Sequence, residues 1–182
     1  MLRKEIYRNQ ENIIKDISEL YLSAFPEEER PPLDKFLNSL KQKEITLLTF
    51  YKEDTFIGFA YLVFYQDICC LFFLAVSSNY RHQGYGGEIL EILKKEYKDY
   101  VIMLCYEEID PKYPNYEERV NRTNFYYSHG FIDNKIKTNE YGVIYETAYI
   151  GSHPISFTNY FQIFKLAFGE GHEANVVDAT NY

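Results

Sequence analysis

Three glycines stand in one short turn of the sequence, at a position where they could hold a phosphate group. Residues 76–87 read VSSNYRHQGYGG, so Gly84, Gly86 and Gly87 lie between an apolar run and a helical pattern. The first turn of a helix presents free N–H groups and a partial positive charge, which together attract phosphate oxygens. Glycine has no Cβ atom, so the backbone can approach an anion closely and can adopt positive φ. The pattern predicts a phosphate-binding turn, and a tight strand-to-helix turn without a ligand is the alternative.

Two better-known phosphate-binding loops fit this turn poorly. The dinucleotide fingerprint requires a third glycine where Ile89 stands, and the P-loop requires Gly-Lys-Ser/Thr, whereas Glu88 follows the glycines here. Arg81 and His82 precede the glycines and could add positive charge near a bound phosphate. The sequence therefore indicates a phosphate-binding turn of another type.

A second motif lies further along the chain. Residues 125–131 read FYYSHGF, in which an aromatic–Tyr pair is followed by three residues and then by Gly-Phe. Together with Arg81, Gly84 and Gly86, which form Arg-x-x-Gly-x-Gly after an apolar strand, this motif resembles the GNAT N-acetyltransferase family. The resemblance extends over about residues 13–150, and the space between the motifs fits one helix, one strand and one loop, as in that family.

The resemblance implies a mixed sheet that splays open between the strand ending at Val76 and the strand beginning at Val101, with acetyl-CoA in the cleft. Main-chain groups of residues 74–76 would pair with the pantetheine arm, and the amides of residues 83–87 would hold the pyrophosphate. Arg81 would lie at the turn, with a structural ion pair as its alternative role. The residues expected to contact acetyl-CoA are Leu74, Ala75, Val76, Arg81, His82, Gln83, Gly84, Tyr85, Gly86 and Gly87.

The resemblance also places Tyr126 where the family keeps a proton donor for the departing thiolate. A phenol suits this role, because its pKa near ~10 lies a little above that of a thiol. Tyr127 is the alternative residue in register. The alternative role for Tyr126 is packing under the cofactor.

Glu107 is the candidate for the base that removes a proton from the acceptor amine. It follows the apolar run at residues 101–106, on the far side of the expected cleft, and it could act directly or through water. Glu108 should point the other way, since side chains alternate along a strand. Both glutamates could instead be solvated loop charges.

The acceptor site would be acidic if the acidic clusters at residues 27–29 and 107–118 both face it. Such a site would favour a cationic amine, for example a polyamine, an aminoglycoside or a basic peptide end. We expect Glu28 and Tyr106 to contact this acceptor. Acid runs are more often solvated faces, which is the alternative for both clusters.

Two alternatives involve other chemistry or no chemistry. Cys105 could act as a nucleophile with His129 as its partner, although a Cys within an apolar strand is usually a small hydrophobic residue. A protein of the same fold could also bind an acyl-CoA or a nucleotide as a sensor, without turnover. The histidines show no metal-ligand spacing, so no metal site is predicted.

Apolar periodicity indicates the elements that would position these residues. Helices are expected to about residue 25 and from about residue 33. Three apolar runs at residues 45–51, 56–65 and 68–76 are joined by short turns, which is typical of an antiparallel meander. After the glycine turn we expect a helix, a strand from Val101, a loop at 107–118, a helix at about 117–129, strands near 131–136 and 143–150, and a last helix at 157–168.

This order predicts one α/β (α+β) domain over residues 1–168, with a mixed, mostly antiparallel sheet flanked by helices, as in GNAT proteins. Residues 169–182 are polar and are expected to form a flexible tail. The chain has 182 residues, of which 46% are hydrophobic and 25% charged, and this balance is typical of a single globular domain.

Charge and cysteine content argue against several other classes of protein. The formal net charge of −8 disfavours sequence-independent DNA binding, which needs a basic face. The sequence has no run of about 18 apolar residues, and its start lacks the apolar core of a signal peptide. Three cysteines without regular spacing do not form a disulfide framework. We therefore expect a cytoplasmic monomer or homodimer, without a nucleic-acid or membrane partner.

Overall fold

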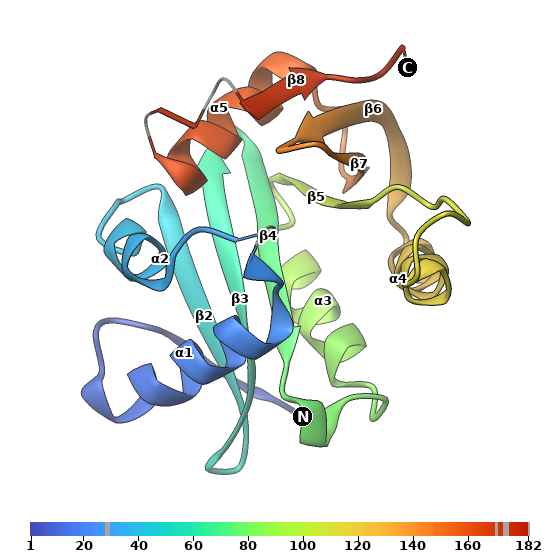
Figure 1. Cartoon of the computed structure of the whole chain (residues 1–182). Helices are drawn as coiled ribbons and strands as arrows, with labels where there is room; N and C mark the ends of the chain where they lie inside the picture. The colour runs from blue at the N-terminus through green and yellow to red at the C-terminus, as the bar shows by residue number, and fades with distance from the viewer. Residues whose placement is uncertain (28–29, 170, 173–174, 182) are drawn as a thin grey trace.

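The computed structural model describes residues 1–27, 30–169, 171–172 and 175–181, and Figure 1 shows their arrangement around one sheet. The sheet has eight strands in the order β1-β2-β3-β4-β5-β7-β6-β8. The strands are β1 (Arg3–Ile6), β2 (Ile45–Lys52), β3 (Thr55–Tyr65), β4 (Ile68–Val76), β5 (Val101–Glu107), β6 (Ile132–Glu140), β7 (Val143–Ile150) and β8 (Val176–Asp178). The helices are α1 (Glu11–Ala24), α2 (Leu33–Ser39), the short 3-10 helix η2 (Ser78–Tyr80), α3 (Tyr85–Glu96), α4 (Tyr116–Ser128) and α5 (Phe157–Phe168).

The three apolar runs of the sequence form the centre of the sheet. β2 pairs antiparallel with β3, and β3 pairs antiparallel with β4, so that Leu47 lies opposite Tyr61 and Tyr61 lies opposite Phe73. These residues are buried because helices cover both faces of the sheet. The antiparallel meander and the mixed, mostly antiparallel sheet expected from the sequence are confirmed.

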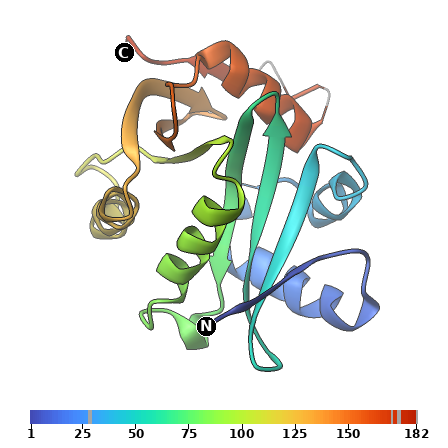
Figure 2. The same ribbon diagram turned by 180° about the vertical axis from the view of Figure 1, so that it is seen from behind.

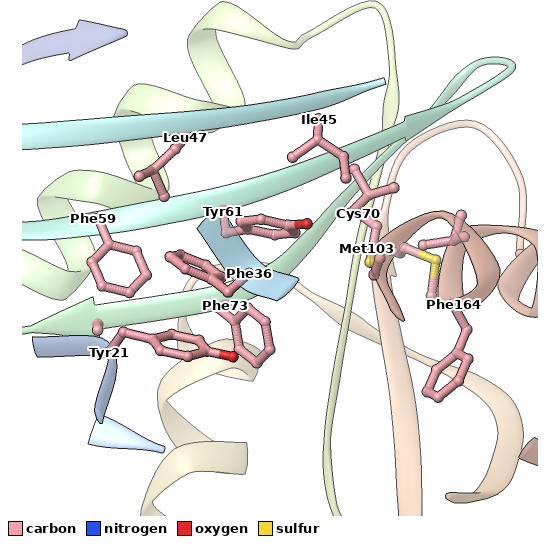
Figure 3. Packing of buried hydrophobic residues seen from close by; sticks show 14 of the residues in the cluster. Tyr21, Phe36, Ile45, Leu47, Phe59, Tyr61, Cys70, Phe73, Met103 and Phe164 are labelled. Carbon is pink, nitrogen blue, oxygen red and sulfur yellow. The ribbon is translucent and has the colours of Figure 1, made fainter. Parts of the chain in front are cut away.

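Helices α1, α2 and α5 cover one face of the sheet, and α3 and α4 lie on the other, as the two opposite views show (Figures 1 and 2). On the first face the aromatic rings pack closely (Figure 3): the rings of Tyr21 and Phe36 stack with centroids 4.0 Å apart, and Phe73 meets Tyr21 edge-on. On the second face, apolar residues of α3 at helical spacing, such as Ile89 and Leu93, are fully buried. Two separate apolar cores therefore hold the sheet between its helices.

The sheet opens between β4 and β5. These two strands are parallel partners only at their beginnings, where Cys69 lies opposite Ile102 and Cys70 opposite Met103. Beyond that point β4 continues along β3 to Val76, while β5 continues along β7 to Glu107. The second halves of the two strands thus separate, which confirms the predicted splay.

Both short edge strands of the sheet were missed by the sequence prediction. β1 (Arg3–Ile6) pairs with β2, and β8 pairs with β6 inside the segment that was expected to be a flexible tail. Both are short, with four residues in β1 and three in β8, so neither shows a clear apolar period. Among the described residues, no helix combines the length and apolarity needed to span a bilayer.

An exposed ion pair joins the β3–β4 turn to the segment after β7. His153 Nε2 lies 2.9 Å from Asp67 Oδ2, and this hydrogen bond raises the pKa of His153 and lowers that of Asp67. Because the folded pKa of His153 is raised, the pair stabilises the fold below the ordinary histidine pKa of about 6.5, as long as Asp67 is ionised. The stabilisation is lost as the pH rises through the raised pKa.

We therefore expect Asp67→Asn to bring the pKa of His153 back toward its ordinary value. The imidazole resonances of His153, followed by NMR over a pH titration, measure this directly. Urea unfolding should show a smaller loss of stability at about pH 8.5 than at about pH 5.5. A titration curve for His153 that is the same in both proteins would contradict the pairing.

Candidate functional site

The glycine turn connects β4 to α3 at the rim of the opening. Gly84 caps α3 with φ +84°, a left-handed conformation that glycine adopts without strain. The first main-chain bond of the helix runs from the N–H of Glu88 to the carbonyl of Gly84, at 3.0 Å. The amides of residues 85–87 precede this bond, so they have no partner within the helix. They form the kind of N-terminus that attracts an anion.

Gly86 and Gly87 need to be glycine for a different structural reason from Gly84. Their φ is not positive; instead, they allow α4 to approach the first turn of α3. A Cβ atom on Gly86 would lie 3.3 Å from Phe125 Cζ, and one on Gly87 would lie 2.5 Å from His129 Nε2. The glycine spacing that the sequence shows therefore serves both an open helix N-terminus and close helix packing.

Two adjoining cavities fill the opening between β4 and β5. The glycine-turn cavity, of about 720 Å³, is bounded by the glycine turn and by the outer part of α4. The inner cavity, of about 360 Å³, is bounded by β4, the end of β5, α4 and the end of α1. The residues common to both are Leu74, Val76, Arg81, Arg122 and Tyr126. A molecule that occupies one cavity therefore lies next to a molecule in the other.

The charged residues of the turn lie as follows. Arg81 lines both cavities, and its Nε donates a hydrogen bond to the carbonyl of Val76, at 3.1 Å, which holds the guanidinium at the end of β4. His82 lines the glycine-turn cavity. Gln83 is exposed, and its side-chain amide turns back to the carbonyl of Asn79, at 3.1 Å. Arg81 thus adds positive charge where the free amides of α3 lie, and His82 lines the same cavity.

Tyr126 is half-buried on α4 and lines both cavities. Burial raises the pKa of its hydroxyl to about 12, although the positive charge of Arg122 acts in the opposite direction. The phenol is therefore protonated at neutral pH and can donate a proton at the boundary of the two cavities.

Glu107 ends β5 and lines the inner cavity with a side chain that is only 2% exposed. Its carboxylate forms an ion pair with the guanidinium of Arg122 on α4. Glu108 points elsewhere, since its carboxylate accepts a hydrogen bond from Lys137 Nζ on β6, at 2.7 Å. β5 ends at Glu107, but the N–H of Glu108 still bonds to the carbonyl of Ile144 on β7, at 2.9 Å, and the two neighbouring glutamates have different partners.

The two residues expected to contact the acceptor do not line the inner cavity in the part of the chain that the structure describes. Tyr106 is buried on the other face of β5, and its hydroxyl is 2.9 Å from that of Tyr127. Glu28 lies outside the described residues. Ala75, Tyr85 and the other cofactor-binding candidates lie along β4 and the turn, so apart from Gln83 the structure brings that set together at the cavities.

The geometry does not support a nucleophilic cysteine. Burial raises the pKa of the Cys105 thiol, and its sulfur lies 3.5 Å from the hydroxyl of Tyr160. His129 has a different partner, because its Nδ1 lies 2.7 Å from the carbonyl of Phe125. The histidine lines the glycine-turn cavity, whereas the cysteine lines the inner one.

Helix α4 supplies two charged residues besides Tyr126: Arg122, which the sequence did not single out, and Glu118, which ends the acidic cluster at residues 107–118 that was expected to face the acceptor. Glu118 and Arg122 line the inner cavity together with Tyr126. The three residues stand four apart, so they share one helix face. Counting back from Tyr126 in steps of four would have found Arg122 and would have placed Glu118 on the same helix face.

Comparisons with known proteins concern the family and the fold of the chain. Residues 14–131 match the model of the Acetyltransferase (GNAT) family. A search of curated proteins finds no match. Among solved structures, a protein from Bacteroides thetaiotaomicron assigned to the GNAT acetyltransferases is 22% identical over 90% of this chain and 95% of its own, with a TM-score of 0.75.

Two further solved structures resemble the chain. The ribosomal-protein-S18-alanine N-acetyltransferase from Escherichia coli is 18% identical, with 86% of this chain and 100% of its own covered and a TM-score of 0.62. An aminoglycoside 6'-N-acetyltransferase complexed with coenzyme A is 19% identical, with 85% and 99% covered and a TM-score of 0.64. At these identities the likeness concerns the fold.

Proposed function

Because the chain belongs to the GNAT family of acetyltransferases, we propose that it moves an acetyl group from acetyl-CoA to a primary amine by direct transfer. The observation that supports this most is the position of Tyr126, a protonated phenol at the boundary of two adjoining cavities. One cavity has the free amides of α3 at its rim, and the other contains the carboxylate of Glu107.

The residues around the glycine-turn cavity fit acetyl-CoA. β4 leaves β5 after Cys70, so the main chain of residues 71–76 offers a strand edge to the amide groups of the pantetheine arm. The free amides of residues 85–87, with Arg81 and His82 nearby, suit the pyrophosphate. When bound, acetyl-CoA supplies an acetyl group activated as a thioester.

The two proton transfers are assigned to two residues of the chain. Tyr126 Oη holds the proton that the departing thiolate needs. Glu107 takes a proton from the amine, directly or through one water molecule. Arg122 holds the carboxylate of Glu107 at the wall of the inner cavity through their ion pair, so it is a positioning residue for this base.

The inner cavity would receive the acceptor amine. Its wall combines the carboxylates of Glu107 and Glu118 with the aromatic side chains of Phe25 and Phe72. Carboxylates attract a cationic amine, and aromatic rings cover the apolar part of such a molecule. A polyamine, an aminoglycoside and the amino end of a peptide all have this chemistry, and two of the structural neighbours are named for such acceptors.

Thiol release from acetyl-CoA in the presence of a panel of amines tests the proposal. The panel contains spermidine, kanamycin and short peptides with a free amino end. Release that depends on one class of amine would support the transferase. Binding of acetyl-CoA without release on any amine would favour the alternative, a sensor of the same fold that binds acyl-CoA or a nucleotide.

Glu107→Gln is expected to lower the rate most at low pH, where the amine is mainly protonated and needs a base. Near and above the pKa of the amine, the rate should approach that of the wild type. The matched control is Glu108→Gln, whose carboxylate pairs with Lys137 on β6 and should matter little. A pH–rate profile of Glu107→Gln identical to that of the wild type would dismiss this residue as the base.

A further inference from the structure

A carboxyl group is buried in the core between β6 and α5, behind the inner cavity. Glu140, at the end of β6, is 7% exposed. One of its oxygens, Oε1, accepts hydrogen bonds of 2.6 Å from the hydroxyls of Thr138 and of Tyr160. Tyr160 belongs to α5 and is only 1% exposed. A buried carboxylate that accepts bonds from two neutral hydroxyls is costly to maintain, and the reaction assigned so far does not use it.

Tyr160 also contacts Cys105, whose sulfur lies 3.5 Å from its hydroxyl oxygen. A phenol has only one proton to donate, and the short bond to the carboxylate takes it. The structure has the Tyr160 hydroxyl as the donor in both contacts. When its proton lies on the Glu140 side, the thiol proton of Cys105 can turn to the phenol oxygen, so that Cys105 donates to Tyr160 and Tyr160 donates to Glu140. Since Cys105 lines the inner cavity, a directed chain of donors leads from the cavity wall to a buried carboxylate.

We propose that Glu140 is a second proton acceptor for an amine in the inner cavity, reached through Cys105 and Tyr160. The inference rests on the proposed acetyl transfer. In one concerted step the ammonium gives a proton to the sulfur of Cys105, the thiol proton of Cys105 passes to the oxygen of Tyr160, and the phenol proton passes to Oε1 of Glu140. One N–H bond is broken and one carboxyl O–H bond is formed. The thiol and the phenol are regenerated, and after the product leaves the proton returns by the same route to water that enters the inner cavity.

The charges around the two carboxylates favour this second route. Protonation of Glu107 breaks its ion pair with Arg122, whereas protonation of Glu140 leaves a neutral acid in an apolar core. The titratable groups that face Glu140 are Cys70, Cys105, Tyr141 and Tyr160. Burial raises the pKa of Glu140, and the hydrogen bonds from Thr138 and Tyr160 lower it. The effect of burial is the larger one, so this carboxylate holds a proton more readily than an exposed one.

A pair of matched variants tests the route. Tyr160→Phe keeps the ring and removes the hydroxyl through which the proton would pass. Thr138→Val removes the other hydroxyl that bonds to Oε1 of Glu140 and lies outside the route. With the best amine of the panel, about two pH units below its pKa, we expect Tyr160→Phe to lower the turnover number at least about tenfold. At a pH above the pKa of the amine, the turnover numbers of Tyr160→Phe and of the wild type should differ little. Thr138→Val should stay within about twofold of the wild type at both pH values.

Cys105 provides a second pair. Cys105→Ala should show the same loss at low pH, and Cys105→Ser should recover most of it, because a hydroxyl can also accept and donate a proton. The affinity for acetyl-CoA, measured by calorimetry, should stay unchanged in Tyr160→Phe. An equal loss in Tyr160→Phe and Thr138→Val at every pH would mean that the hydroxyls only support the fold, and it would overturn the proposal.

A measurement without turnover follows the route directly. At a pH low enough for Glu140 to carry a proton, infrared spectroscopy after mixing with D₂O reports the exchange of its carboxyl proton, and the carboxylic-acid band is assigned by its loss in Glu140→Gln. Exchange should be slowed in Tyr160→Phe and in Cys105→Ala, and fast in Thr138→Val; exchange as fast as in the wild type would overturn the route. If no amine of the panel makes the wild type release CoA, the proposed function fails, and the role of Glu140 as a base in that reaction fails with it. Normal release that Tyr160→Phe leaves unchanged overturns the route alone.

Discussion

The Tyr126→Phe variant is expected to turn over about 10²–10⁴-fold more slowly than the wild type, which is the usual contribution of a placed general acid. The change removes one hydroxyl at the boundary of the two cavities and keeps the ring, so packing should be preserved. The hydroxyl acts only as charge develops on sulfur, so its loss raises the transition state and leaves the bound ground state unchanged. The Michaelis constant for acetyl-CoA should therefore change little, and CoA should still bind.

The matched control is Tyr127→Phe on the neighbouring position of α4. Tyr127 is 41% exposed, and its hydroxyl meets only that of Tyr106 among the hydrogen bonds described for it, so the loss should be about 1 kcal/mol of stability or less. Turnover has to be measured where the chemical step limits the rate. A Tyr126→Phe enzyme with wild-type turnover would leave the acid unassigned. If that variant instead lost affinity for acetyl-CoA while keeping its turnover, packing under the cofactor would be the better account.

The pKa of Tyr126 adds a test on the wild type alone. Because burial raises that pKa to about 12, the phenol should remain a donor through the range in which an exposed tyrosine ionises. The turnover number should then show no alkaline decline near pH ~10 that belongs to this residue.

Most of the fold could be predicted because its elements have strong local patterns. β2, β3 and β4 are long apolar runs separated by short turns, and such turns allow only antiparallel pairing. The separation of β4 from β5 was expected only from the resemblance of the chain to the GNAT family. Nothing in the composition of β5 indicates where its pairing with β4 stops. The edge strand β8 escaped prediction because three residues carry no measurable period.

The site was predictable only where its residues stand close together in the sequence. The glycine turn and the aromatic motif are local, so both could be found from their spacing. The partners of Glu107 and Glu140 are Arg122, fifteen residues away, and Tyr160, twenty residues away, and they lie on helices whose positions depend on the packing of the whole sheet. Contacts of this kind follow from tertiary structure, which local patterns do not encode.

Gly86→Val is expected to weaken the binding of acetyl-CoA by about 10- to 100-fold. A Cβ atom at this position would already lie 3.3 Å from Phe125 Cζ, and valine adds two methyl groups in the same space. Overpacking of this kind costs about 1–3 kcal/mol, and here it would displace either Phe125 or the first turn of α3, whose amides line the glycine-turn cavity. Calorimetry on a variant that is shown to be folded by circular dichroism measures the affinity.

A second pair of glycines separates damage to the turn from damage to the fold. Gly84 and Gly142 have φ of +84° and +89°, and a Cβ atom on either one would meet nothing within 4 Å. Alanine should therefore strain both backbones equally, by about 1–2 kcal/mol. Only Gly84→Ala should also lower the affinity for acetyl-CoA, because Gly84 caps α3 whereas Gly142 lies in the β6–β7 turn. Unchanged affinity in both Gly86→Val and Gly84→Ala would remove the pyrophosphate from this turn, since neither the shape nor the order of its amides would then matter for binding.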